Sequence, residues 1–308
     1  MIAISVIIPF HNRPEYFDRL FNSLYKIKRD DVEIVFVDNN SDAKTREIIQ
    51  SYISILREQT SLKISIITEL RPGAPAARNA GLEHAIGDYV YFFDSDDELS
   101  ADMLTMAYYK AKQDDADVVA LRTKILINGR KMVFKKMVFN ENPRYQIICN
   151  NIATQTVFLK RSFALNHARW NEQLFYWNDL EWGLRILLSW PKISWLHGCF
   201  HTIYVHTNSI TGASFAQRLN NIIYAHQAMQ DDILKYSKGA KQRHELLTML
   251  DYRTAIYAGH IFKEGYAKAA EQLLSIIDKS DLSHVNKIKV KILFFLSKIG
   301  LPGLWRLI

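Results

Sequence analysis

Four carboxylates within five residues form the segment of this sequence with the clearest capacity for chemistry. They occur in Asp94-Ser95-Asp96-Asp97-Glu98, directly after the apolar run 89–93. Aromatic and β-branched residues favour a buried strand, and open α/β sheets bind ligands where strands end. In extended backbone Asp94 and Asp96 point the same way, so they can hold one cation. The alternative is an acidic turn in which Ser95 or Asp97 starts the next helix.

Two further polar motifs follow apolar runs earlier in the sequence. They are Pro9-Phe10-His11-Asn12-Arg13 and Val37-Asp38-Asn39-Asn40-Ser41-Asp42. Polar side chains at neighbouring strand ends can form a crevice for the base and ribose of a nucleotide. Asn39, Asn40 and Ser41 are equally typical of an ordinary turn and helix cap, so both interpretations stay open.

A positive charge for an anionic ligand comes from Arg78, in the segment Gly73-Ala74-Pro75-Ala76-Ala77-Arg78-Asn79-Ala80-Gly81. Gly73 permits a tight loop, and the Arg78 guanidinium can reach a diphosphate in the crevice. Neither GxGxxG after the first apolar run nor GxxxxGK[ST] occurs. The sequence therefore argues against a nicotinamide dehydrogenase and a P-loop enzyme, and leaves phosphate binding to a metal ion and side chains.

Alternating strand and helix patterns must position these motifs. Apolar runs predict strands at 4–8, 33–37, 63–67 and 89–93, and helical spacing predicts helices over 16–24, 43–56 and 74–85. Pro14 fits the first turn of the first helix. This order predicts an α/β fold with a mostly parallel sheet, helices on both faces and the motifs along one edge.

The rest of the sequence changes character twice. Residues 101–215 mix helix and strand patterns, with a hairpin predicted around Asn128-Gly129-Arg130, and from Ser214 the pattern is mainly helical. The segment 287–308 is basic and strongly apolar. It is interpreted either as an interfacial membrane segment or as a helix packed on the rest of the protein.

Composition limits the class of protein. The 308 residues, 48% of them hydrophobic, can bury the core of one large or two modest domains. The chain has 39 Lys and Arg against 32 Asp and Glu, and the resulting net charge of +7 favours an anionic partner without identifying it. Cys149 and Cys199 lack zinc-ligand or disulfide spacing. With neither a signal-peptide pattern nor a membrane-spanning stretch, a cytoplasmic protein with reduced thiols is expected.

The order of the motifs resembles that of the family-two glycosyltransferases of GT-A fold. The resemblance rests on segments 5–13, 37–41, 77–81 and 87–97, and it is strong over residues 1–100, moderate to about 215 and nearly absent beyond. It implies a GT-A, Rossmann-like sheet with a C-terminal helical extension. The implied division is a nucleotide-sugar-binding half in 1–100, an acceptor-binding half in 101–215 and the helical extension in 216–308.

The resemblance also implies roles by position. The residues implied for the nucleotide-sugar donor are Pro9, His11, Asp38, Asn39, Arg78, Asp94 and Ser95. Asp94 and Asp96 form the implied Asp-x-Asp element, which holds a divalent cation, Mg²⁺ or Mn²⁺, against the diphosphate. The family often has a second Asp where this chain has Asn39, and an amide changes which base edges are read. A UDP-sugar is the expected donor, with guanine and thymine nucleotides left open.

A second acidic motif, Asn178-Asp179-Leu180-Glu181, is similar to the family's motif at the start of the acceptor-side helix. It implies Asp179 as the general base, with Glu181 as the alternative, although many relatives have Glu-Asp where this chain has Asn178-Asp179. Otherwise Asn178 or Asp179 caps a helix, and Glu181 pairs with Arg185 at the surface.

Aromatic and imidazole side chains supply the remaining candidates. His206 lies in a segment similar to one that closes over donor phosphates, which implies a metal or diphosphate ligand, and a structural role is the alternative. Trp170, Trp177 and Trp182 flank the candidate base. They can stack on a sugar, but core packing is favoured for each.

These features predict a metal-dependent inverting transferase that moves a hexosyl or N-acetylhexosaminyl group to a hydroxyl of a saccharide or lipid-linked saccharide. Cell-surface polysaccharide or lipid-linked glycan assembly is the expected setting, with segment 287–308 offering peripheral contact with the inner face of the cell membrane. No nucleic acid is expected as a partner. The alternatives are a metal-dependent nucleotidyltransferase and a non-catalytic protein that binds nucleotide sugars or nucleic acid.

Overall fold

The chain folds into two compact units that interleave along the sequence. The computed structural model describes residues 1–127, 131–134, 140–205, 214–277 and 282–308. The first unit comprises Met1–Phe139, Ile152–Phe175 and Trp190–His206, and the second comprises Asn140–Asn151, Tyr176–Ser189 and Thr207–Ile308. These units do not follow the boundaries at residues 100 and 215, so the division into donor-binding and acceptor-binding segments stays a prediction.

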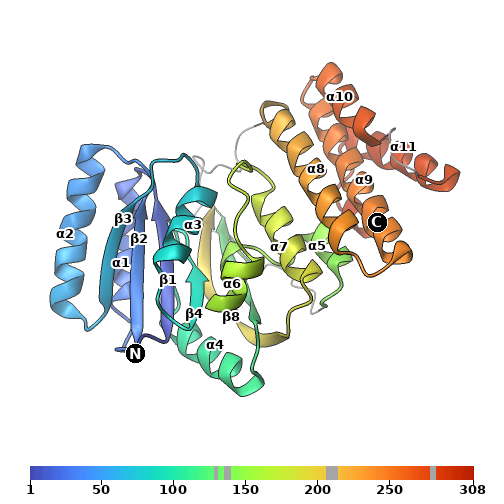
Figure 1. Ribbon diagram of the computed structural model, residues 1–308. Coiled ribbons are helices and arrows are strands. Elements are labelled where there is room, and N and C mark those ends of the chain that lie inside the picture. Colours follow the sequence, from blue (N-terminus) through green and yellow to red (C-terminus); the bar gives the residue numbers. More distant parts are fainter. Residues whose placement is uncertain (128–130, 135–139, 206–213, 278–281) are drawn as a thin grey trace. The chain divides into compact units, whose positions relative to one another are not determined.

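One sheet forms the centre of the first unit (Figure 1). Its strands are β1 (Ile4–Phe10), β2 (Val32–Asp38), β3 (Lys63–Thr68), β4 (Tyr89–Phe92), β5 (Val118–Ile127), β6 (Lys131–Phe134), β7 (Val157–Lys160) and β8 (Ile193–Val205). The order is β3-β2-β1-β4-β7-β5-β6, and β8 pairs with β5. The first four strands pair in parallel, as predicted. The carboxyl ends of β1, β2 and β4 therefore lie along one edge.

Helices cover both faces of β1, whose residues are all buried. The helices of this unit are α1 (Phe17–Leu24), α2 (Ala43–Gln59), α3 (Ala74–His84), α4 (Ala101–Asp114) and α6 (Arg161–His167). Ile4, Val6 and Ile8 share a core with residues of α1, α2 and α4. Ile7 points to the other face, where a Cβ at Gly81 of α3 would lie 2.3 Å from its Cγ2. Side-chain alternation thus explains why β1 is apolar on both faces, and the predicted two-sided coverage is confirmed.

The other strands of the sheet include antiparallel pairs. β5 and β6 form the predicted hairpin, with Ile127 opposite Lys131, and the turn residues 128–130 lie outside the described part of the chain. β7 pairs antiparallel with β4 and β5. β8 runs parallel to β5, with an irregularity in register next to Arg122.

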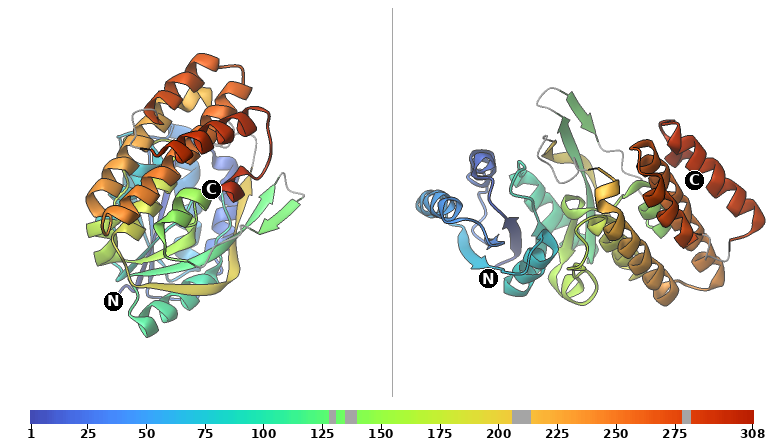
Figure 2. Two further views of the ribbon diagram at one scale, coloured as in Figure 1. Left: turned by 90° about the vertical axis from the view of Figure 1, so that its right-hand side faces the viewer. Right: turned by 90° about the horizontal axis from the view of Figure 1, so that it is seen from above.

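The second unit is helical. Its helices are α5 (Pro143–Cys149), α7 (Asn178–Leu188), α8 (Leu219–Tyr236), α9 (Ala240–Lys263), α10 (Ala267–Ile277) and α11 (His284–Lys298). α11 packs along α9 (Figure 2), where Ser297 Oγ donates to the Ile256 carbonyl at 2.6 Å. The helical character predicted beyond Ser214 is confirmed, and one face of the segment 287–308 packs on the protein. In the described chain, no helix combines the length and apolarity needed to cross a membrane.

Candidate active site

The loops after β1 and β2 are joined by hydrogen bonds. His11 Nδ1 lies 2.7 Å from the Asn39 carbonyl oxygen, and the Asn12 N–H donates to Ser41 Oγ at 3.0 Å. The Asp42 N–H donates in return to Asn12 Oδ1 at 2.9 Å. Asn12 has φ of 53°, a left-handed conformation that Asn adopts more readily than most residues. Two of the predicted nucleotide-binding motifs therefore form one polar surface at the sheet edge.

Asp38 ends β2 with its carboxylate buried. Its Oδ1 accepts the Ser41 N–H at 2.8 Å, and its Oδ2 lies 3.8 Å from Arg46 Nη1. Within the described structure, Oδ2 is buried and accepts no hydrogen bond. A buried acceptor without a donor is unfavourable. This oxygen is therefore suited to an N–H donor supplied by a ligand.

The Asn39 amide holds the loop between β3 and α3. Its Nδ2 donates to the carbonyl oxygens of Glu69 at 2.9 Å and Arg71 at 2.7 Å, and its Oδ1 accepts the Gly73 N–H at 2.8 Å. Both amide donors are thus used inside the protein. Asn39 therefore supports the loop between β3 and α3, and its predicted direct contact with a nucleotide stays a prediction.

The acidic segment after β4 is organised by Arg78 and Gln155. Asp94 accepts from Arg78 Nη2 at 2.7 Å and from Gln155 Nε2 at 3.1 Å. The same Gln155 amide donates to Asp97 Oδ2 at 2.5 Å, and the Tyr204 N–H donates to Asp97 Oδ1 at 2.7 Å. Sequence reasoning missed Gln155, because a single Gln in the short 3-10 helix Thr154–Thr156 before β7 belongs to no recognisable motif. Asp97 is the most buried carboxylate of the segment and does not start a helix, since α4 begins at Ala101.

The electrostatics of this segment fit a cation. Burial, then the charges of Asp96 and Asp94, raise the pKa of Asp97 well above its usual value. Asp96 is partly exposed and lies 3.9 Å from Arg13 Nη1. The described residues contain no group of three or more His, Cys, Asp or Glu side chains placed to enclose a metal ion. Mg²⁺ needs no such enclosure, because it commonly uses one or two carboxylates with phosphate oxygens and water, and Asp94 and Asp96 match that donor set.

The other predicted donor-side residues differ in their surroundings. Pro9 is buried in β1. The pairing of β1 with β4 ends at Ile7, so the absence of an N–H at Pro9 removes no hydrogen bond to β4. Ser95 is partly exposed between the two candidate metal ligands. His206, the third candidate metal ligand, lies outside the described residues.

Arg78 is oriented by Trp170. Arg78 is 6% exposed, and its guanidinium carbon lies 4.4 Å from the centre of the Trp170 ring. Asn79 fixes that residue, since its side chain accepts the Trp170 N–H at 2.8 Å and donates to the Trp170 carbonyl at 2.9 Å. Trp170, Trp177 and Trp182 are all buried, which confirms core packing for each.

Asp179 lies in the first turn of α7, in the second unit. Trp177 precedes this helix with φ of 61°, and its carbonyl accepts the Glu181 N–H at 2.9 Å. The Asp179 N–H donates to Asn178 Oδ1 at 2.7 Å. Arg253 of α9 lies 5.2 Å from the Trp177 ring centre, so the long helix α9 supports the start of α7.

Glu181 is engaged within the second unit. Arg185 Nε donates to its Oε1 at 2.7 Å. The pair predicted at spacing four is therefore present, but its predicted surface location is wrong, because Glu181 is only 2% exposed. Asp232 of α8 lies 3.9 Å from the same Arg185 nitrogen. Burial, followed by the charge of Glu181, raises the pKa of Asp232 to about 7.

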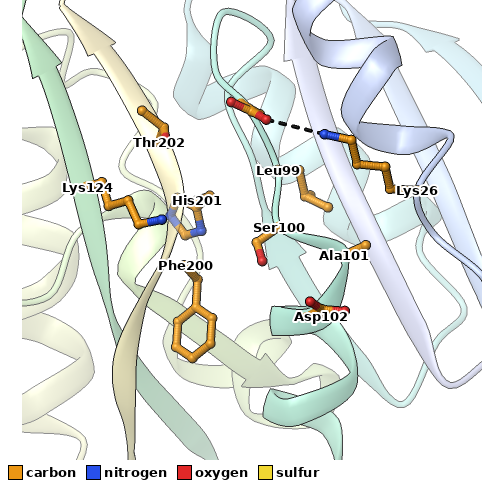
Figure 3. A pocket seen from close by; sticks show the side chains of 10 residues that line it. Lys26, Leu99, Ser100, Ala101, Asp102, Lys124, Phe200, His201 and Thr202 are labelled. Carbon is orange, nitrogen blue, oxygen red and sulfur yellow. Dashed lines mark hydrogen bonds and ion pairs between the residues drawn. The ribbon is translucent and has the colours of Figure 1, made fainter. Parts of the chain in front are cut away.

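A separate pocket of about 340 Å³ lies between β8 and the β4–α4 connection (Figure 3). Asp94 and Asp96 do not line it. Lys26 and Glu98 on its wall form an ion pair of 3.5 Å, and Lys124 and Asp102 add one charge of each sign. This mixture of charges gives no preference for an anionic or a cationic ligand.

A family model described as "Glycosyl transferase family 2" matches residues 5–175, more than half of the chain. The chain belongs to this family. The match includes the strand-end motifs of the first unit and ends before Asp179.

Proteins of known name are similar in sequence to part of this chain. A cholesterol galactosyltransferase of Borreliella burgdorferi is 26% identical over 68% of this chain and 62% of its own length. The poly(ribitol-phosphate) β-N-acetylglucosaminyltransferase TarS of Staphylococcus aureus is 33% identical over 42% of this chain. The chain covers only 22% of TarS.

Solved structures share the fold over nearly the whole chain. Residues 1–349 of S. aureus TarS align with a TM-score of 0.65 and 18% identity over 97% of this chain and 90% of that one. A mannosyltransferase of Pyrobaculum calidifontis aligns with a TM-score of 0.60 and 16% identity over 99% of this chain and 82% of that one. The family and these neighbours confirm the GT-A-like fold with its helical extension.

The three hydrogen bonds between the Asn39 side chain and the loop before α3 predict that replacing this side chain destabilises the protein. In Asn39→Asp, a carboxylate oxygen would face the carbonyl oxygens of Glu69 and Arg71 where the amide now donates. We expect the free energy of unfolding to fall by about 1–3 kcal/mol. The exposed neighbour in Asn40→Asp is the control and should differ little from wild type. Equal unfolding midpoints in urea for both variants would show that the Asn39 hydrogen bonds do not stabilise the protein.

Asp232 predicts a pH dependence of stability. Its pKa in the folded protein is about 7, above its ordinary value of 3.8, so its contribution to stability is complete at low pH and is lost as the pH rises toward and through 7. Between pH 5 and 8 the wild-type free energy of unfolding should therefore fall more than that of Asp232→Asn. Each pKa unit between folded and unfolded states corresponds to about 1.4 kcal/mol. Glu271→Gln, which removes an exposed carboxylate of α10, should keep the wild-type profile, and parallel profiles for all three proteins would refute this assignment.

Proposed function

We propose that the protein is an inverting glycosyltransferase that moves a sugar from a nucleotide diphosphate to an acceptor hydroxyl. The observation that carries the proposal is the Asp94 carboxylate, held by Arg78 and Gln155 at the end of β4. This site shares the sheet edge with the joined loops of β1 and β2. Membership of glycosyl transferase family 2 supports the reaction class.

The Asp38 carboxylate supports the choice of nucleotide. Its buried Oδ2 can accept an N–H from the base, and both uracil (N3–H) and guanine (N1–H) carry a ring N–H. TarS has been solved with UDP and with UDP-GlcNAc, and the Pyrobaculum mannosyltransferase with GDP-Man and Mn²⁺. We take a UDP-hexose or UDP-N-acetylhexosamine as the donor of this protein.

A divalent cation, Mg²⁺ or Mn²⁺, completes the proposed donor site. Asp96 and Asp94 would hold it, and when bound it would neutralise charge on the diphosphate. The chain itself supplies Arg78, whose buried guanidinium orients Asp94. Gln155 fixes the other Asp94 oxygen, so the carboxylate has little freedom to turn. The proposed site is therefore held in place before the donor arrives.

Asp179 is the proposed general base. The acceptor hydroxyl attacks the anomeric carbon, its proton passes to the Asp179 carboxylate, and the bond from that carbon to the diphosphate oxygen breaks. Glu181 is less suited to this step, because it is buried and its carboxylate accepts from Arg185. Attack opposite the leaving group inverts the anomeric configuration.

The acceptor is proposed to be a saccharide or lipid-linked saccharide of a cell-surface glycan. The names of two relatives describe transfer to cholesterol, a lipid, and to poly(ribitol phosphate), a polymer. We further propose that transfer to these acceptors takes place at the cytoplasmic face of the membrane.

Product analysis tests the reaction class. The protein is incubated with single nucleotide sugars and with Mg²⁺, Mn²⁺ or EDTA, and the nucleotide products are separated. Release of a nucleoside diphosphate, dependent on the metal and lost in Asp96→Asn, is expected. Release of inorganic pyrophosphate would instead indicate nucleotidyl transfer. Metal-independent turnover that survives in Asp96→Asn would contradict the metal assignment.

Substitution of the candidate base tests its role. Asp179→Asn should lower kcat by about 10²- to 10⁴-fold, because the amide cannot take the hydroxyl proton, while the dissociation constant for the donor stays unchanged. Glu181→Gln is the matched control and should keep far more of the transfer rate once its fold is verified by circular dichroism. A wild-type rate in Asp179→Asn would exclude this residue as the base.

A further inference from the structure

Helix α11 has two apolar faces, of which one packs on α9. Val290, Leu293 and Ser297 form the packed face and are buried. Gly259 permits the close approach, since a Cβ there would lie 2.4 Å from Ser297 Cβ. The Phe294 and Phe262 rings meet edge to face at 6.0 Å between centres. α11 is therefore anchored in the second unit by its own set of contacts.

The second apolar face is exposed. It consists of Val285, Ile288, Ile292, Phe295 and Ile299, each between 48% and 72% exposed, and we call this set the α11 stripe. Their separations alternate between three and four residues. On a helix with 3.6 residues per turn this spacing aligns all five side chains along one line. Five large exposed apolar side chains in line are unusual for a surface that meets only water.

Positive charge borders the α11 stripe. The helix contains Lys287, Lys289, Lys291 and Lys298 and no Asp or Glu. At 3.6 residues per turn, Lys291 lies on one side of the stripe, with Lys287 and Lys298 beyond it, and Lys289 lies on the other. Lys287 and Lys291 are exposed, whereas Lys289 and Lys298 lie over the rings of Tyr252 and Phe262. The border of the stripe is thus cationic on both sides.

We propose that the α11 stripe binds the surface of an anionic lipid bilayer. A helix lying in the interface buries its apolar line at the boundary of headgroups and acyl chains, and its lysines contact lipid phosphates. A second copy of the chain fits this surface less well, because pairing two such helices would bring lysines together without any carboxylate from α11 to offset them. The inference concerns binding alone and does not depend on the proposed transfer reaction.

Vesicle flotation of the full-length protein tests the inference. Vesicles of phosphatidylcholine alone are compared with vesicles that also contain phosphatidylglycerol. Wild type should float with the anionic vesicles at least about tenfold more than with the neutral ones, and less so as salt is raised. Absence of flotation, or equal flotation with both vesicle types, would overturn the proposal.

Paired variants separate the apolar and the charged contributions. Ile292→Ser/Phe295→Ser should reduce binding to anionic vesicles by roughly tenfold or more, and Lys287→Gln/Lys291→Gln should weaken it and lessen its dependence on salt. The controls are Leu234→Ser, at an equally exposed apolar residue of α8, and Lys241→Gln/Lys268→Gln, which removes two exposed charges elsewhere in the second unit. Both controls should bind as wild type does.

Two further measurements keep the result interpretable. Circular dichroism and thermal unfolding establish that each variant is folded. The rate at which a nucleoside diphosphate is released from a nucleotide sugar, in solution without detergent or vesicles, should be unchanged by the stripe substitutions. Flotation of folded Ile292→Ser/Phe295→Ser at the wild-type level would refute the proposal. Sedimentation showing a wild-type dimer that this variant converts to a monomer would assign the stripe to a second copy of the chain instead.

Discussion

The ion pair between Arg78 and Asp94 is the contact on which the proposed donor site depends. Arg78 is almost fully buried, and a buried guanidinium without a counter-charge is strongly destabilising. Asp94 supplies that counter-charge at 2.7 Å, and the Trp170 ring centre lies 4.4 Å from the guanidinium carbon. The pair thus neutralises one carboxylate of a crowded acidic segment and fixes it at the end of β4. Asp96 remains beside it, partly exposed, in a position suited to a cation shared with phosphate oxygens.

The loops at the sheet edge that holds this pair are joined by backbone groups as much as by side chains. Asn39 uses its amide on the loop that leads into α3, and that helix carries Arg78 itself. The conformation of the second motif is therefore linked to the position of the ion pair through one short loop. Asp38, by contrast, keeps one buried oxygen that accepts no hydrogen bond from the residues the structure describes. Two adjacent residues of one motif thus differ in role, because the Asn39 side chain holds the loop before α3 and Asp38 is the residue proposed to meet the nucleotide.

Much of the first unit could be predicted from sequence. The apolar runs of β1, β2 and β4 are short and sharply bounded, so their ends and the polar residues that follow were evident, and parallel pairing placed those ends together. Gln155 was not predictable, since its bond to Asp94 joins residues 61 apart in the chain and leaves no local pattern. The burial of Glu181 was missed for a similar reason, because the pattern of α7 alone does not show that α8 brings Asp232 near Arg185. The two-unit division likewise depends on contacts of α7 with helices of the C-terminal region, which spacing within one segment cannot reveal.

The central claim is that Asp94, held by Arg78, and Asp96 form the part of the protein that meets a metal-bound diphosphate. Anomalous diffraction from crystals grown with Mn²⁺ and a UDP-sugar tests this claim most directly. The account predicts one manganese peak within bonding distance of an Asp96 or Asp94 oxygen and of the diphosphate, with the uracil N–H at Asp38 Oδ2. A diphosphate bound without manganese at these carboxylates, or a base bound away from Asp38, would contradict it.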